Sequence, residues 1–399
     1  MIGRDAAARW AGGLPRTFWW LWLGVLVNRV GTVVQPFLAL YLTTGRHLSV
    51  AGAGAVVAVT GAGSIASQPL GGALADRAGR RPTIVGGMVA SGLAITALAL
   101  AHAIWLVALF AFVVGVTGDL SRPASTATIA DVVPVADRRR ASGLVYWVVN
   151  VGFSIAAVAG GLLAARGYGL LFALDATTCC AYALVVWRTI PETRPAAAVH
   201  DDAPGWGAVL RDRLAMALFG LNVAVITVYA AEFTIMPLAM RADGLPASAY
   251  GAVVAANGIG IVVLQPLLSA RLLRLKPASC LAAGTVLAAI GVGVVAVSDH
   301  VAGYGLAIAF ITLGEIANAT GGSGLVAEIA PPALRGRYAG AYGLTFGVAF
   351  TVTPLVGGAL LGDGGAPAPW IAAGVLSVAA GAGLLALGPA LEARRAVAV

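Results

Sequence analysis

The sequence predicts an all-α polytopic membrane protein with twelve transmembrane helices. Of the 399 residues, 59% are hydrophobic and only 11% are charged, with a mean hydropathy of +0.91. A soluble domain carries roughly 25% charged residues, so this chain cannot cover a water-facing surface of its own size. Apolar stretches recur at the length of about 20 residues that a helix needs to cross a bilayer. Period-2 alternation is absent, which excludes a transmembrane β-barrel.

The apolar runs define the spans, and short polar or charged segments separate them. The spans are expected at 17–43, 51–74, 83–101, 104–131, 140–165, 168–190, 213–240, 247–271, 277–297, 302–329, 336–361 and 367–389. The first span begins with the Trp-rich stretch "RTFWWLWLGVLV", which is typical of an aromatic interface anchor. Pro36 and Pro237 interrupt the first and seventh spans, where we expect fixed kinks rather than hinges.

The positive charges predict the orientation of the chain. Most of the 25 Lys and Arg residues fall at the two chain ends, in the central linker or after even-numbered spans, and only Arg46, Arg166 and Arg241 fall on the other side. By the positive-inside rule both termini are cytoplasmic. This distribution explains the net charge of +8 without a nucleic-acid partner. Arginine outnumbers lysine 24 to 1, which favours a GC-rich bacterial genome and a bacterial cytoplasmic (inner) membrane.

The polar stretch "PETRPAAAVHDDAPGWGAVLRDR" divides the chain into two sets of six spans. We expect an N-terminal bundle over 1–190, a cytoplasmic linker over 191–212 and a C-terminal bundle over 213–399. The end of the linker, "WGAVLRDR", predicts a short interfacial helix. An internal repeat supports the division, because "GAVVAVTGAGSIASQPL" matches "GAVVAANGIGIVVLQPL" at an offset of 197 residues. Parallel repeats of this kind are related by an axis along the membrane normal.

The segment "GGALADRAGRRP" (71–82), which joins the second and third spans, carries a specific motif. It resembles the signature loop of the major facilitator superfamily, with the pattern Gly-x-Leu-Ala-Asp-Arg-x-Gly-Arg-Arg. The matching residues are Gly72, Leu74, Ala75, Asp76, Arg77, Gly79, Arg80 and Arg81. Together with twelve spans in a 6+6 repeat, the resemblance covers essentially the whole chain. It is strongest to the 12-span drug-efflux-type branch of proton antiporters.

The resemblance implies a secondary active transporter that works by alternating access. In the family, the acid that matches Asp76 packs against the other half in the outward-facing state. The arginine that matches Arg80 pairs with an acid at the end of span four, here Asp131. The loop would then act as a conformational switch, and the alternative is a plain positive-inside loop. The corresponding loop of the second half, "QPLLSARLLRLKP", lacks the acid, so we expect an asymmetric switch.

Two stretches depart from the efflux-type pattern. Val113 and Val114 stand where such relatives often carry an arginine in span four. Ala156 and Ala157 replace the Gly-Pro of the antiporter signature in span five, whereas Pro354 keeps the proline in the second half. Proton-coupled export of small amphipathic molecules remains the favoured function. The alternative is an importer, or a lipid or peptide transporter with different coupling.

Five ionisable residues lie near the middle of spans: Arg29, Asp119, Arg122, Glu232 and Glu315. A charge at that depth is costly, so such residues usually face a cavity or a partner. All five fall on spans one, four, seven and ten, which line the central cavity in the superfamily. We therefore expect them to line a path for substrate and protons.

The roles of these charges are ranked by their neighbours. Asp119 and Arg122 share a helix face and can pair, and Arg29 could also reach Asp119. This leaves open whether the pair only fixes helix packing, and whether Arg122 holds Asp119 or an anionic part of the substrate. Glu232 has no basic neighbour in its span, so it ranks first as a proton carrier or cation site, ahead of Asp119 and Glu315.

Uncharged polar residues could shape the substrate site or serve as interhelical contacts. They are Asn28, Gln35, Tyr41, Tyr229, Asn257 and Asn318. Asp175 in span six is expected to be structural. No metal-ligand spacing, nucleotide-binding loop or catalytic constellation is found, so we expect no metal, no cofactor and no enzyme activity, with the proton gradient as energy source. The expected partners are a small-molecule substrate, protons and the lipid bilayer, around a monomer.

Overall fold

The computed structural model of the chain describes residues 12–134, 137–194, 206–272, 274–331, 334–363 and 367–398. Within these residues the regular structure is entirely helical, and twelve helical segments are long and apolar enough to cross a membrane. The predicted fold class is thereby confirmed. Residues 195–205 of the expected linker, like Arg4 and Arg9 near the start of the chain, lie outside the described residues.

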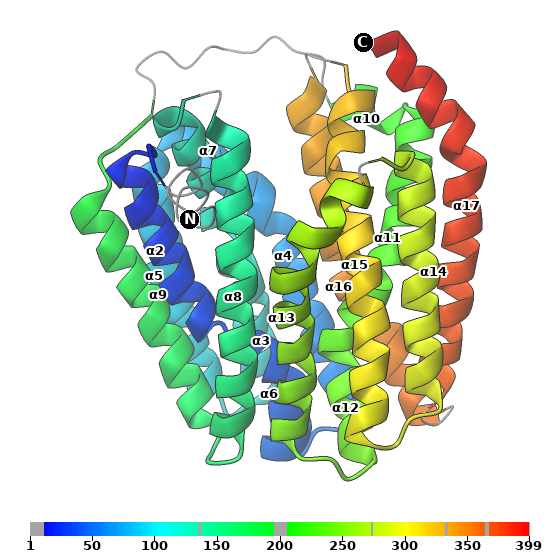
Figure 1. Cartoon of the computed structure of the whole chain (residues 1–399). Coiled ribbons are helices and arrows are strands. Elements are labelled where there is room, and N and C mark those ends of the chain that lie inside the picture. The colour runs from blue at the N-terminus through cyan, green and yellow to red at the C-terminus, as the bar shows by residue number, and fades with distance from the viewer. Residues whose placement is uncertain are drawn as a thin grey trace, which may run out of the picture.

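The helices fall into two groups that lie side by side (Figure 1). The first group contains α2 (Arg16–Gly31), α3 (Val34–Leu40), the π-turn η1 (Tyr41–Gly45), α4 (Val50–Arg77), α5 (Arg80–Leu100), α6 (Ile104–Gly118), α7 (Ser121–Val132), α8 (Arg138–Ala164) and α9 (Gly169–Thr189). The second contains α10 (Trp206–Leu210), α11 (Arg213–Thr234), α12 (Met236–Ala242), α13 (Ala247–Leu272), α14 (Pro277–Ala296), α15 (Val301–Ile329), α16 (Arg335–Asp363) and α17 (Ala368–Ala398). The short helix predicted at the end of the linker is α10.

The start of α2 and the end of α17 lie at the same end of the molecule, which we call the terminal end (Figure 1). The other end is called the opposite end. The domain boundaries proposed from the sequence stay a prediction, because much of the linker lies outside the described residues.

Prolines interrupt spans one and seven as predicted. A proline lacks a backbone N–H, and its ring clashes with the carbonyl group four residues earlier, so the helix breaks just before it. Pro36 follows the break between α2 and α3, and Pro237 follows the break between α11 and α12. The Asp175 carboxylate of α9 accepts a hydrogen bond of 3.1 Å from the Val34 N–H, which the first break leaves without a helical partner. Asp175 thus has the structural contact that the sequence led us to expect.

The fourth span, predicted over 104–131, contains two helices that are divided at Asp119 and Leu120. The cause is Pro123, whose ring would clash with the Asp119 carbonyl in a continuous helix. A tight turn replaces the helix, with the Arg122 N–H donating to the Asp119 carbonyl oxygen at 3.0 Å. The span itself is confirmed as Ile104–Val132, and the interruption within it is a feature that the sequence analysis did not predict. The break places an acid and a base at a helix junction inside the membrane span.

Two helix pairs join the halves, α4 with α16 and α8 with α13. Both pairs approach closely near the opposite end. A Cβ atom on Gly54 would lie 2.4 Å from the Pro354 carbonyl oxygen, and one on Gly251 would lie 2.5 Å from the Ala157 carbonyl oxygen. The two contacts are equivalent under the offset of 197 residues in the sequence repeat. Ala157 therefore makes the same backbone contact as Pro354, although it lacks the proline of the antiporter signature.

Helices α4 and α16 are apart near the terminal end. A Cβ atom on Gly72 of α4 or on Gly343 of α16 would meet no heavy atom within 4 Å. The halves are therefore in backbone contact at the opposite end and separated at the terminal end.

Candidate transport site

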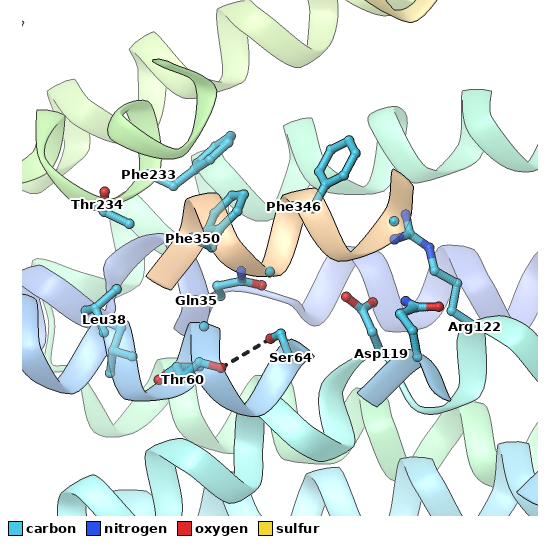
Figure 2. A pocket seen from close by; sticks show the side chains of 15 residues that line it. Gln35, Leu38, Thr60, Ser64, Asp119, Arg122, Phe233, Thr234, Phe346 and Phe350 are labelled. Atoms are coloured by element: carbon cyan, nitrogen blue, oxygen red, sulfur yellow. Dashed lines mark hydrogen bonds between the residues drawn. The ribbon is translucent and has the colours of Figure 1, made fainter. Parts of the chain in front are cut away.

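A cavity of about 400 Å³ lies between the two halves (Figure 2). On α4 its lining runs between the close contact at Gly54 and the open position at Gly72. Its polar wall comes from the first half and contains Gln35, Thr60, Ser64, Gln68, Asp119 and Arg122. Its aromatic wall comes from α11 and α16 of the second half and contains Phe233, Phe346 and Phe350. An amphipathic molecule would find one polar and one apolar surface in this cavity.

The ion pair at the polar wall joins spans one and four. Arg29 Nη2 lies 3.6 Å from Asp119 Oδ1. Arg122 also lines the cavity, and within the described ranges its guanidinium makes no ion pair and no side-chain hydrogen bond. Figure 2 shows Asp119 and Arg122 side by side at the break between α6 and α7. Asp119 thus lies between two arginines: it pairs with Arg29, and the charge of Arg122, which lines the cavity, also acts on it.

Glu232 is the most deeply buried of the five ionisable residues, with a relative exposure of 1%. Neither of its carboxylate oxygens has a hydrogen-bond partner among the described residues. Tyr250 contacts the Glu232 backbone instead, donating to its carbonyl oxygen at 3.3 Å. Burial without a partner strongly disfavours the charged form of a carboxylate, so the neutral acid is the form that this site accommodates.

A polar cluster in the second half lies near Glu232. Asn257 Nδ2 donates to Glu315 Oε2 at 3.1 Å, and Asn318 Nδ2 donates to the Tyr229 hydroxyl at 2.7 Å. The charge of Glu315 is close enough to act on Glu232. None of these residues is among those that line the 400 Å³ cavity. The structure therefore separates the predicted residues into a cavity group and a buried acidic group.

Two residues considered for the substrate site make interhelical contacts instead. Asn28 is buried and its Nδ2 lies 3.5 Å from the Cys179 sulfur. Tyr41 packs edge-on against the rings of Tyr168 and Phe172. Within the described ranges, no group of three or more His, Cys, Asp or Glu residues is arranged to hold a metal ion.

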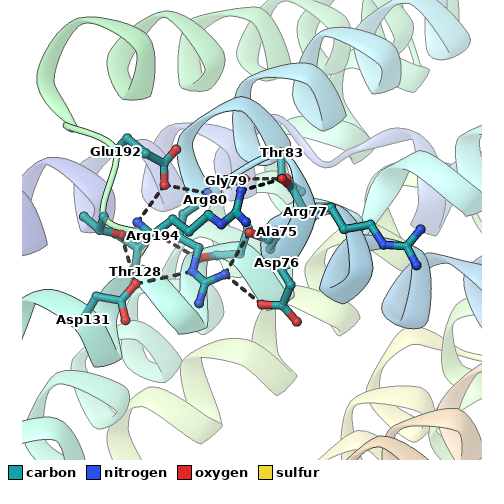
Figure 3. Close-up of polar contacts among 12 residues, drawn as sticks. Ala75, Asp76, Arg77, Gly79, Arg80, Thr83, Thr128, Asp131, Glu192 and Arg194 are labelled. Atoms are coloured by element: carbon teal, nitrogen blue, oxygen red, sulfur yellow. Dashed lines mark hydrogen bonds and ion pairs between the residues drawn. The ribbon is translucent and has the colours of Figure 1, made fainter. Parts of the chain in front are cut away.

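The loop between α4 and α5 forms an ionic network at the terminal end (Figure 3). Arg80 Nη1 donates to Asp76 Oδ1 at 2.8 Å, and Arg80 Nε lies 3.4 Å from Asp131 Oδ2. The Thr193 hydroxyl donates to the same Asp131 oxygen at 3.1 Å. The Asp76 side chain is 74% exposed. This network joins spans two, three and four.

Glu192, which the sequence analysis did not single out, completes this network. Its two carboxylate oxygens accept hydrogen bonds from the Arg80 N–H at 2.9 Å and the Arg81 N–H at 3.1 Å, at the start of α5. Gly79 precedes them with φ of 110°, and a Cβ atom there would lie 2.4 Å from Glu192 Oε2. Burial raises the pKa of Glu192, but the backbone N–H donors, which include Arg80 and Arg194, outweigh it and keep the pKa below its usual value.

Two further arginine contacts join this loop to the end of span six and the residues that follow it. The Arg81 guanidinium donates to the Trp187 carbonyl oxygen. Arg194 Nη1 donates to the Arg77 carbonyl oxygen at 2.6 Å. The only sequence signal for this docking was an acid in "PETR", directly after the sixth span.

Twelve apolar spans within the described residues, and a cavity with charged and aromatic walls between the two halves, are the features of a polytopic membrane transporter. The sequence model of the Major Facilitator Superfamily matches residues 21–314 and 223–397, and the chain belongs to this family. The family suggested by the signature loop is thereby confirmed.

Named relatives include both drug and cation transporters. The chain is 26% identical to the uncharacterized MFS-type transporter YhjO of Bacillus subtilis (strain 168), with 90% of each chain covered. It is 27% identical to the multidrug resistance protein MdtH of Aeromonas hydrophila, with 90% of this chain and 92% of the relative covered. It is 25% identical to a Na(+), Li(+), K(+)/H(+) antiporter of Planococcus maritimus, with 81% and 84% covered.

Solved structures show the same fold. A peptide transporter POT in complex with sulfate superposes with a TM-score of 0.82 at 16% identity, with 96% of each chain covered. The human organic anion transporter MFSD10 (TETRAN) superposes with a TM-score of 0.69 at 18% identity, with 92% of this chain and 99% of that chain covered. At these identities the likeness concerns the fold alone.

Proposed function

We propose that the chain is a proton-coupled secondary transporter that exports small amphipathic molecules by alternating access across a bacterial cytoplasmic membrane. Membership of the Major Facilitator Superfamily makes it a membrane transporter, and the named multidrug and cation/proton relatives support the finer assignment. The cavity with one polar and one aromatic wall supports an amphipathic substrate.

The observation that carries proton coupling is Glu232. It combines 1% exposure with two carboxylate oxygens that have no partner among the described residues. Such a group is accommodated as the neutral acid, and it ionises once a conformational change brings water or a cation to it. Phe233, its neighbour in sequence, lines the cavity, so proton and substrate would act on the same turn of α11.

The arrangement of the halves supports alternating access. With both termini in the cytoplasm, as the positive-inside rule favours, the terminal end faces inward and the cavity is open to the cytoplasm. The glycine contacts at the opposite end then form the closed outer gate. In the other conformation, which is open to the outside, these contacts must separate while the loop that contains Asp76 closes against the second half.

The test is transport in proteoliposomes with an imposed proton gradient and a panel of amphipathic substrates. We expect gradient-driven movement of at least one substrate away from the side that carries the termini. Glu232→Gln should abolish the dependence on the gradient. Glu392→Gln is the matched control, because Glu392 pairs with Lys276 at the exposed terminal end.

If every substrate ignores the gradient and Glu232→Gln transports normally, the proton-coupled assignment fails. Gradient-driven accumulation in the reverse direction would instead support import.

A further inference from the structure

We infer that the central cavity binds an amphipathic anion, with Arg122 as the residue that binds the anionic group and the three phenylalanines as the surface for its apolar body. This rests on the proposed function only in taking the cavity as the transport site. It narrows the substrate class from amphipathic molecules in general to those that carry a negative charge.

The charge balance of the cavity favours an anion. The negative charge of Asp119 is already matched by Arg29 at 3.6 Å. Arg122 adds a second positive charge beside this one acid: its charge also acts on Asp119, but within the described residues its guanidinium forms no ion pair. The other two acids at this depth, Glu232 and Glu315, are not among the cavity-lining residues. A guanidinium without an ion-pair partner is best satisfied by a carboxylate, sulfonate or phosphate, which it can bind through two parallel hydrogen bonds.

Neutral donors flank the arginine. Gln35 and Gln68 line the same polar wall, and each side-chain amide carries two N–H donors. The Ser64 hydroxyl donates to the Thr60 carbonyl oxygen at 3.2 Å, as the dashed line in Figure 2 marks. The wall that holds Arg122 therefore offers amide donors to an anionic group and no unmatched acid to repel it.

The aromatic wall has a different role. The rings of Phe233 and Phe350 are nearly parallel, with an interplanar angle of 14° and centroids 6.3 Å apart. Phe346, one turn from Phe350 on α16, is 43% exposed. A large ring exposed toward a cavity gains free energy when an apolar group covers it. The volume of about 400 Å³ lies in the range of sites for small organic ligands. The ligand would thus bridge the halves, with its anionic group on the first and its apolar body on the second.

The test compares three probes that share one aromatic body and differ in charge: dansylate (anionic), dansylamide (neutral) and dansylcadaverine (cationic). Binding to the purified full-length protein in phosphatidylcholine nanodiscs is measured by fluorescence polarisation. Dansylate should bind about tenfold or more tightly than dansylamide, as expected for a charge-assisted hydrogen-bonded contact. Arg122→Gln should remove this difference, and Arg122→Lys should keep part of it. Phe346→Leu should weaken dansylate and dansylamide alike.

A second variant, Asp119→Asn, should increase the affinity for the anionic probe instead of lowering it. Asp119→Asn releases Arg29, which leaves two unpaired guanidinium groups beside the cavity. Dansylate should then bind several-fold more tightly than to the wild type, and dansylcadaverine more weakly. Melting temperature and size-exclusion profile confirm that each variant is folded. A gain in anion affinity cannot come from misfolding.

Three outcomes overturn the inference: failure of dansylate to bind, tightest binding of dansylcadaverine, or equal loss of all probes in Arg122→Gln. Repeating the titration with phosphatidylglycerol in the nanodisc tests whether the anion that binds Arg122 is a lipid headgroup rather than a small molecule. Displacement of dansylate by this lipid would assign the anion site to a lipid headgroup and overturn a small-molecule occupant. Because binding is measured without a proton gradient, the result is independent of whether Glu232 couples transport.

Discussion

The glycine contact between α4 and α16 gives the sharpest prediction about the conformational cycle. A Cβ atom on Gly54 would lie 2.4 Å from the Pro354 carbonyl oxygen, about 1 Å inside an ordinary carbon–oxygen contact. Neither atom belongs to a flexible side chain, so Gly54→Ala can be accommodated only if the two helices separate. The substitution should therefore disfavour the state in which the halves touch at the opposite end.

The magnitude follows from the cost of overpacking. Adding a methyl group to a tightly packed position costs about 1–3 kcal/mol. Because each 1.4 kcal/mol is a factor of ten, the ratio of molecules open to molecules closed at the opposite end should rise about 5- to 150-fold. The gain in helix propensity from Gly to Ala is present in both conformations and cancels in this ratio.

Electron-spin distance measurement between the two halves reports this ratio. Labels at Arg166 and Asp299, on loops at the opposite end of the first and second halves, are attached in a background without native cysteines. Gly54→Ala should increase the population with the longer distance.

The matched controls are Gly86→Ala on α5 and Gly293→Ala on α14, two exposed positions away from the contact between the halves where a Cβ atom meets nothing within 4 Å. They should leave the ratio unchanged. A response of the controls equal to that of Gly54→Ala, or a shift toward the shorter distance, would refute the reasoning.

Three further predictions concern the breaks and the loop. Because Glu192 caps the start of α5, Glu192→Ala should cost about 0.5–2 kcal/mol of stability, measured by thermal unfolding. The pKa of Glu192 is lower in the folded protein, so its contribution to stability is present at neutral pH and is lost as the pH falls through the folded pKa. The melting temperatures of the variant and the wild type should therefore converge in acid. A difference in melting temperature that widens in acid would contradict this. Asp175→Leu should cost about 1–3 kcal/mol by leaving the Val34 N–H unpaired, whereas Asp175→Asn, which keeps an acceptor, should cost less; equal losses would argue against the hydrogen bond. Pro123→Ala should allow a continuous helix across Asp119 and change the direction of the Arg122 side chain. Dansylate should then bind more weakly while the melting temperature changes little, and unchanged binding would refute a role for the break.

The transmembrane spans were predictable because their signals are one-dimensional. A run of about 20 apolar residues is sufficient to recognise each helix, and proline alone predicts the interruptions at Pro36 and Pro237. The same rule applied to Pro123 would have predicted the break in span four.

The walls of the cavity were only half predictable. Charged and amide residues such as Arg122 and Gln35 stand out in an apolar span, because lipid does not tolerate them. Phe233, Phe346 and Phe350 do not stand out, because a membrane helix is apolar on its lipid face and on its packed face alike. Glu192 lies in a polar segment where an acid is unremarkable. Its role depends on the distance to the start of α5, which only the three-dimensional fold fixes.

The position of Glu232 on α11 suggests how proton and substrate could oppose each other. Phe233, the next residue, faces the cavity, and the helix ends one residue later at Thr234, before the break that Pro237 imposes. Ile235 joins the two helices, because it donates to the Ala231 carbonyl oxygen and accepts from the Ala239 N–H, and the end of α11 can bend at this junction. A ligand that moves the Phe233 ring therefore moves the Glu232 carboxylate by the same bending, out of a site that accommodates only the neutral acid. Reciprocity then requires that the protonated acid, by holding the buried orientation, lowers the affinity for that ligand by the same factor. This is the linkage that an exporter driven by proton entry needs.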